Sequence, residues 1–150
     1  MTGMKRLEGM PVLAGERHAG SVMRGVLNPD GRALRGLVIR SPLVGARWLN
    51  REQILVLGKV SVIARGKPGK IPPDADYRLF RVSDANGERL GVVTDAIINE
   101  ETMRVQALEI SSGPIDDLIT GRWYATAFSV LPGKEWGHVT VFCDGKGVKE

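Results

Sequence analysis

The residues that could do chemistry are few and widely spaced. His18 and His138 are the two histidines, and neither lies at a metal-ligand spacing with Cys143, the single cysteine. No neighbouring histidine or helix start would activate Cys143, so we expect it to be a small core residue. The pair Asp116-Asp117 would suit general acid–base catalysis, but two acids in a first helical turn are also favoured by the helix dipole. We therefore expect no enzymatic activity, no metal site and no cofactor.

Three glycine-containing stretches resemble binding loops but lack their spacing. GERLGVVTDAIIN (87–99) has no G-x-G-x-x-G pattern, and GKPGK (66–70) has no G-x-x-x-x-G-K-[ST] pattern. DANGE (84–88) lacks the spaced oxygens and the final bidentate glutamate of a calcium loop. Gly91 and its counterpart Gly20 each open a long apolar run, so we expect them to permit a bulge or bend instead of holding a phosphate.

The chain contains two related units. A shift of 71 positions aligns residues 20–39 with residues 91–110 without a gap, including five identities and matching apolar positions. An alignment of this length predicts a tandem duplication. Two glycines and three prolines in RGKPGKIPPDAD predict a fairly extended linker. The predicted organisation is a first repeat at 8–65, a linker at 66–76 and a second repeat at 77–145.

Apolar residues in both repeats recur with a period of two, which predicts short strands. The expected strands are 10–13, 19–28, 33–41, 47–50, 54–57 and 60–64, followed by 77–83, 90–99, 103–111, 122–128 and 138–143. The stretch PIDDLITGR departs from this period, because a proline and two acids open it and a glycine ends it. It predicts one short helix near 115–121. The expected fold class is therefore all-β, with two tandem small barrels and one short helix.

The charge is distributed unequally between the halves. Residues 1–75 contain 13 basic and 5 acidic residues, whereas residues 76–150 contain 8 basic and 12 acidic residues. This complementarity could dock the halves, build homo-oligomers, or leave a basic face for an anionic partner. The sequence offers no apolar stretch long enough for a membrane span, and a single cysteine suits a reducing cytoplasm.

The pattern of both repeats resembles the PRC-barrel domain. A glycine opens a valine-rich strand, an asparagine ends it, and a second strand rich in leucine and isoleucine follows; GERLGVVTDAIIN followed by MRVQALEI is the closer match. This small SH3-like barrel is known from the reaction-centre H subunit and the C-terminal domain of the ribosome maturation factor RimM. The DDLITGR insert is similar to that of bacterial proteins with tandem PRC domains. The resemblance implies a non-catalytic adaptor or scaffold that binds a protein partner.

Arginine and tryptophan are the best candidates for contacts with such a partner, because both are enriched at interface hot spots. The candidate partner-binding residues are Arg35, Arg40, Arg47, Trp48, Arg122, Trp123 and Trp136. With an offset of four further positions, Arg47-Trp48-Leu49 meets Arg122-Trp123-Tyr124. Trp136 is expected on a loop before the last strand, where it is exposed or closes the barrel. For each of the paired tryptophans, the alternative is that it caps its own barrel under an arginine stem.

Two further functions stay open. Seven arginines between residues 17 and 51 could contact a nucleic acid, with Arg35, Arg40 and Arg47 as the candidates we would test. Few aromatic residues are available for base stacking. Attachment to an anionic membrane surface is the third alternative.

Arg24 and Asp95 occupy equivalent positions in the alignment and carry opposite charges. If the repeats pack about a pseudo-twofold axis through these strands, the two side chains would pair across it. The sequence therefore predicts an ion pair between the repeats.

Overall fold

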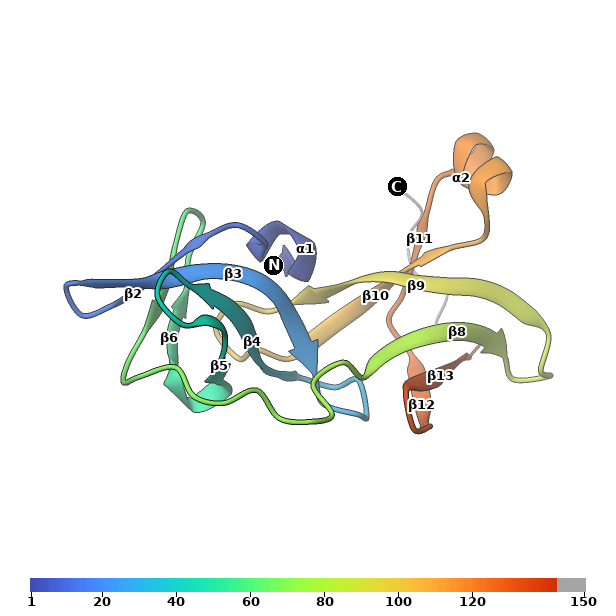
Figure 1. Ribbon diagram of the computed structural model, residues 1–150. Helices are drawn as coiled ribbons and strands as arrows, with labels where there is room; N and C mark the ends of the chain where they lie inside the picture. Colours follow the sequence, from blue (N-terminus) through green and yellow to red (C-terminus); the bar gives the residue numbers. More distant parts are fainter. Residues whose placement is uncertain (143–150) are drawn as a thin grey trace.

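The computed structural model describes residues 1–142, which form two curled, barrel-like sheets that lie next to each other (Figure 1). The first sheet has the spatial strand order β5-β4-β3-β2-β7-β6. Its strands are β2 (Pro11–Ala14), β3 (Arg17–Leu27), β4 (Leu34–Ser41), β5 (Gly45–Asn50), β6 (Ile54–Leu57) and β7 (Val62–Ala64). A 3-10 turn, η1 (Arg51–Gln53), joins β5 to β6. The all-β fold class is thus confirmed.

The second sheet repeats this order as β11-β10-β9-β8-β13-β12. Its strands are β8 (Arg78–Asp84), β9 (Arg89–Ile98), β10 (Val105–Ser111), β11 (Trp123–Ala125), β12 (Phe128–Pro132) and β13 (Trp136–Val141). In both sheets the first strand pairs parallel to the last one, β2 with β7 and β8 with β13, and the other neighbours within each order pair antiparallel. Two units with one strand order and one parallel closure support the predicted duplication.

Gly20 and Gly91 occupy the same place in the two sheets. Their φ angles are 152° and 146°, in a region that L side chains rarely adopt. A Cβ on Gly20 would collide with the carbonyl oxygen of Arg40, and a Cβ on Gly91 would collide with that of Ser111. Each glycine therefore allows a close approach of two neighbouring strands, as small curled sheets require.

A bulge follows each of these glycines. In β3 the pairing with β4 shifts between Val22 and Arg24, and in β9 the pairing with β10 skips Thr94. Extra residues of this kind raise the local twist and help a sheet to curl.

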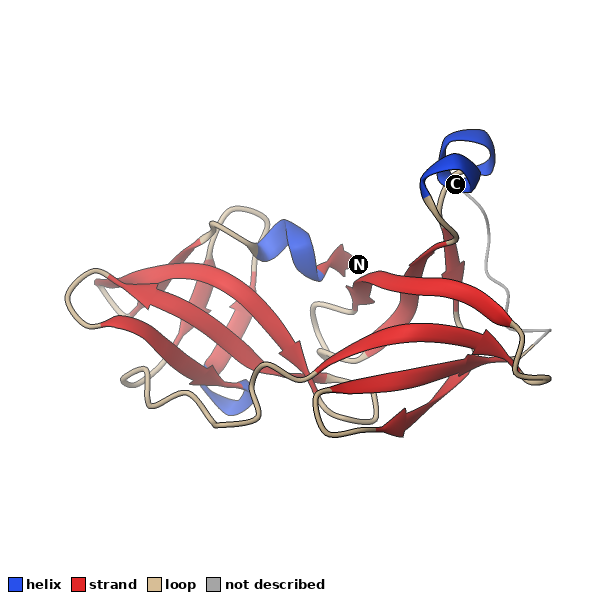
Figure 2. Cartoon of the chain, turned by 45° about the vertical axis from the view of Figure 1, so that its right-hand side comes forward, coloured by secondary structure: helices blue, strands red, loops and turns tan. Residues whose placement is uncertain are grey.

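The helix α2 (Pro114–Thr120) forms where the sequence predicts it. Pro114 stands in its first turn with Asp116 and Asp117, and Gly121 ends it with a positive φ. It occupies the tip of the β10–β11 hairpin and projects beyond the second sheet (Figure 2).

Three expectations about the strands are wrong. The run 122–128 is not one strand: β11 ends at Ala125 and β12 begins at Phe128, because the chain bends at the two residues between them. β13 begins at Trp136, two residues earlier than expected, since the β12–β13 turn closes with a bond from Gly133 N to Trp136 O. Likewise, β7 begins at Val62 and not at residue 60, because the turn after β6 closes with a bond from Gly58 N to Ser61 O. Cys143, at the end of the expected last strand, lies outside the described residues.

The first residues of the chain cross to the second sheet. β1 (Thr2–Gly3) pairs with Ile97 and Ile98 of β9, and α1 (Met4–Leu7) follows at once. Leu7 is fully buried in a core cluster that contains residues of both sheets. Two residues of strand carry no periodicity, so this docking segment was not predicted.

The two sheets also meet at their hairpin turns. Leu34 N donates to Met103 O, and Val105 N donates to Arg32 O. Arg32 and Arg51 of the first half donate from their guanidinium groups to the carbonyls of Phe128 and Thr102. Part of the basic charge of the first half therefore docks the halves together.

Candidate partner-binding surfaces

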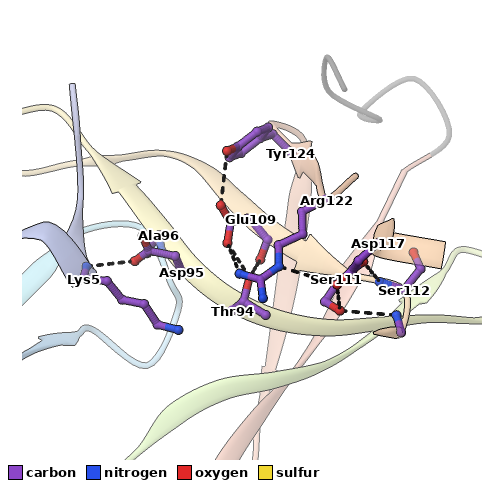
Figure 3. Close-up of polar contacts among 11 residues, drawn as sticks. Lys5, Thr94, Asp95, Ala96, Glu109, Ser111, Ser112, Asp117, Arg122 and Tyr124 are labelled. Atoms are coloured by element: carbon purple, nitrogen blue, oxygen red, sulfur yellow. Dashed lines mark hydrogen bonds and ion pairs between the residues drawn. The ribbon is translucent and has the colours of Figure 1, made fainter. Parts of the chain in front are cut away.

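Arg24 and Asp95 do not form the predicted ion pair. Arg24 Nη2 lies 2.7 Å from Asp76 Oδ1, at the end of the linker. Asp95 Oδ1 instead accepts hydrogen bonds from the backbone N–H groups of Ala96 and Lys5, at 2.8 Å and 3.2 Å (Figure 3). The prediction fails because α1, which the sequence did not reveal, takes the carboxylate that Arg24 was expected to bind.

Both side chains nevertheless line one cleft between the sheets, with a volume of about 570 Å³. Its walls come from α1, β3, β9 and the segment that leads into β8. Burial raises the pKa of Asp95, although the two hydrogen bonds stabilise the ionised carboxylate and act to lower the pKa. Arg24 Nη1 is buried without a hydrogen-bond partner among the described residues. The acids and bases of this cleft balance each other, so its charge selects no class of ligand.

Trp48 lies on the outer face of the first sheet and is covered by the chain itself. Its side chain is 6% exposed and packs with Val26, Val38 and Ala75. It lies over Gly36, where a Cβ would collide with the indole ring. Gly69 of the linker exchanges two backbone hydrogen bonds with Trp48, at 2.8 Å and 2.9 Å.

Arg35 completes this cover. Its guanidinium lies 5.7 Å from the centroid of the Trp48 ring and 3.1 Å from Asp74 Oδ1. Arg40 is exposed and Arg47 is half-buried on the neighbouring strands. Of the three arginines named for nucleic-acid contact, Arg35 is thus engaged within the chain.

Trp123 is not the structural counterpart of Trp48. Trp48 is opposite Val38, whereas Trp123 is opposite Ile110, which is the equivalent of Ile39. The residue that stands in the place of Trp48 is Tyr124. A slip of one residue moves a side chain to the other face of a sheet, and Trp123 accordingly packs in the main core.

Arg122 belongs to a polar network beneath α2 (Figure 3). Its guanidinium lies 3.1 Å from Glu109 Oε1 and 3.5 Å from Asp117 Oδ2. Burial opposes ionisation of Glu109, but hydrogen bonds from Thr94, Arg122 and Tyr124 lower its pKa. The network ties the start of α2 to the sheet, so Arg122 positions the helix.

The helix that this network holds is apolar on its outside. Ile115, Leu118 and Ile119 are 73%, 88% and 74% exposed. Ser111 Oγ donates to Asp117 Oδ2 at 2.6 Å and fixes the first turn. We call the exposed side chains of Ile115, Leu118 and Ile119 the α2 patch. The sequence reveals the helix, but whether its aliphatic residues face the core or the outside depends on the tertiary structure.

Trp136 stands on β13 beside an arginine and a phenylalanine of β8. Its ring meets Phe80 edge to face, with centroids 5.7 Å apart. Arg81 lies over the Trp136 ring at 5.4 Å, and Arg78 lies over the Phe80 ring at 5.7 Å. The sequence named Trp136 but missed its partners, because β8 and β13 are distant in the chain; the alternation Arg78-Phe80 on one strand was the available signal.

No helix among residues 1–142 has the length and apolar character of a membrane span. The same residues contain no group of three histidine, cysteine or acidic side chains placed to hold a metal ion.

Comparison with known proteins locates a family match in the second half of the chain. Residues 74–140 match the model of the PRC-barrel domain, from the end of the linker to the penultimate residue of β13. No curated protein matches the chain. The match includes Gly91, the bulge after it and the hairpin that carries α2. Residues 74–140 therefore contain a PRC-barrel domain.

Proposed function

We propose that this protein is a non-catalytic adaptor that binds a protein partner through the surfaces of its barrels. The observation that carries the proposal is the α2 patch. Three exposed aliphatic side chains on a short helix would be costly to leave in water without a use, and contiguous exposed apolar residues mark interaction sites. The polar network that holds this hairpin tip on the sheet also lowers the entropy that ordering costs on binding.

The nucleic-acid alternative has less support. A nucleic-acid surface needs free cations that reach phosphates. Arg24, Arg32, Arg35 and Arg51 all bind acids or carbonyls of the chain itself. Four of the nine arginines of the first half thus hold the linker and the second half.

The test compares proteins captured from a lysate of the producing organism by the wild type and by two variants. Leu118→Asp with Ile119→Asp places charges in the α2 patch. Leu43→Asp is the matched control, because Leu43 is 95% exposed at the equivalent hairpin tip of the first sheet. We expect a partner retained by the wild type and the control and lost by the α2 variant. Equal capture by all three proteins would contradict the role of the patch.

A further inference from the structure

We propose that β8 and β13 form a second docking surface, which binds an acidic peptide segment with an apolar anchor residue. The surface consists of Arg78, Phe80, Arg81 and Trp136, which we call the Arg–aromatic strip. Two guanidinium groups and two rings alternate along it, at the distances given above. Both arginines are exposed and both rings are half-buried.

Neither arginine of the strip forms an ion pair within the part of the chain that the structure describes. Arg24, Arg35 and Arg122 each have a carboxylate within 4 Å, whereas Arg78 and Arg81 have none among the described residues. They lie in the half of the chain that carries net negative charge. The strip is therefore a local concentration of unneutralised cations, and its charge complements an acidic segment.

Stacking determines which anion suits these cations. A guanidinium over a ring can still bind a carboxylate with two hydrogen bonds, because its N–H groups point outward in its own plane. The same stacking covers one face of the Trp136 ring, on which a nucleic-acid base would otherwise stack. The geometry thus favours carboxylates over bases.

A hollow beside Trp136 provides space for an apolar side chain. It has a volume of about 400 Å³ and lies along the β12–β13 turn. Its lining is formed by Leu131, Pro132, Gly133, Lys134, Glu135, Trp136 and His138. Leu131 is 73% exposed on β12, which is the edge strand of the second sheet. A peptide that crosses from this turn toward β8 would place one side chain in the hollow and its acids over the strip.

The strip and the α2 patch are independent surfaces. α2 projects from one end of the second sheet, and β12 and β13 lie at the other end (Figure 1). The two surfaces also differ in chemistry, one aliphatic and one cationic and aromatic. An adaptor with both could hold two different partners at once.

The test is a selection of short linear peptides from a random phage-displayed library on the intact protein. We expect the selected peptides to share aspartate or glutamate on either side of a leucine, isoleucine or aromatic residue. Their affinity, measured by fluorescence anisotropy of a labelled synthetic peptide, should fall about tenfold or more in the double variant Arg78→Glu and Arg81→Glu, and it should weaken with added salt. Surface charge changes at exposed arginines leave the fold intact, which circular dichroism checks.

Arg89→Glu is the matched control, because Arg89 is exposed on the neighbouring strand β9 and has no stacked ring among the described residues. It should bind the peptide like the wild type, and so should Leu118→Asp with Ile119→Asp. Selected peptides without an acidic bias, or equal affinity for the double variant, would overturn the proposal. An empty selection would do the same. Binding of labelled single-stranded RNA that only the double variant loses would assign the strip to nucleic acid instead.

Discussion

The outer faces of the two sheets show how one strand order can serve opposite purposes. In the first sheet, Trp48 lies over Gly36 and is covered by Gly69 of the linker and by Arg35 of β4. In the second sheet, Tyr124 stands in the same place and its hydroxyl donates to Glu109. The hairpin tips differ as well: the first is a short turn, whereas the second carries α2. The first sheet uses its outer face to hold the linker, and the second keeps its outer structures available for contact.

The largest expected effect distinguishes the two outer faces. Trp48→Ala removes a buried aromatic side chain that packs on both the sheet and the linker, and should lower the free energy of unfolding by about 4 kcal/mol. Tyr124→Ala should cost less, about 1 kcal/mol, because Tyr124 is half-buried and the linker does not cover it. Urea unfolding monitored by circular dichroism measures both. Equal losses would mean that the linker adds no packing to Trp48.

The next largest effect is expected at the glycine that the two sheets have in common. Gly20→Ala and Gly91→Ala each force a Cβ against a carbonyl oxygen at a positive φ, and each should cost about 3 kcal/mol. Gly69→Ala is the control, since a Cβ there meets open space. Its free energy of unfolding should stay within about 0.5 kcal/mol of the wild type. If either of the first two variants matched this control, the glycines would not be needed for close strand approach.

These comparisons show which features a sequence can reveal. The glycines, the bulged strands and α2 follow from local signals: a repeated spacing, a period of two, and a proline, acids and a glycine around a helix. Trp123 was misplaced because a local match of Arg-Trp fits two registers, and only the pairing with β10 decides between them. The docking of α1 on Asp95 and the stacking of Phe80 with Trp136 join segments far apart in the chain. Such contacts depend on tertiary structure and leave no local pattern.

A smaller effect concerns the docking of the N-terminal segment on β9. Asp95→Ala removes the acceptor of two backbone N–H groups and should cost about 1 kcal/mol. Asp95→Asn keeps a carbonyl acceptor at this place and should cost less.

The pH dependence of Asp95 has a defined sign. Because burial raises its pKa in the folded protein, the folded state holds the proton more tightly than the unfolded state does. Wild-type stability from this group is therefore highest below the unfolded pKa of about 3.9 and falls as the pH rises through the folded pKa. Asparagine does not ionise, so the Asp95→Asn variant lacks this fall. Between pH 4 and pH 7 its free energy of unfolding in urea should rise relative to that of the wild type. A constant difference would contradict the buried, ionisable role of Asp95.

The smallest effect on stability comes from exchanging the hairpin tips. Replacing residues 113–122 with the first-sheet tip Pro-Leu-Val-Gly-Ala removes α2 and Arg122, and with them the ion pairs that the half-exposed Arg122 forms with Glu109 and Asp117. Such pairs are individually weak, so the free energy of unfolding at pH 7 should change by less than about 1 kcal/mol.

The exchange should also alter the response to acid, because Arg122 helps to keep the pKa of Glu109 low. A lowered pKa stabilises the folded state above the unfolded value of about 4.3, and this contribution is lost as the pH falls through the folded pKa. The tip-exchanged protein lacks Arg122 and therefore has less of this stabilisation to lose. Its free energy of unfolding should come closer to that of the wild type as the pH falls. If the tip-exchanged protein no longer captures the partner but its free energy of unfolding at pH 7 changes little, α2 serves binding and not folding. A loss of several kcal/mol would instead make α2 a structural element of the second sheet.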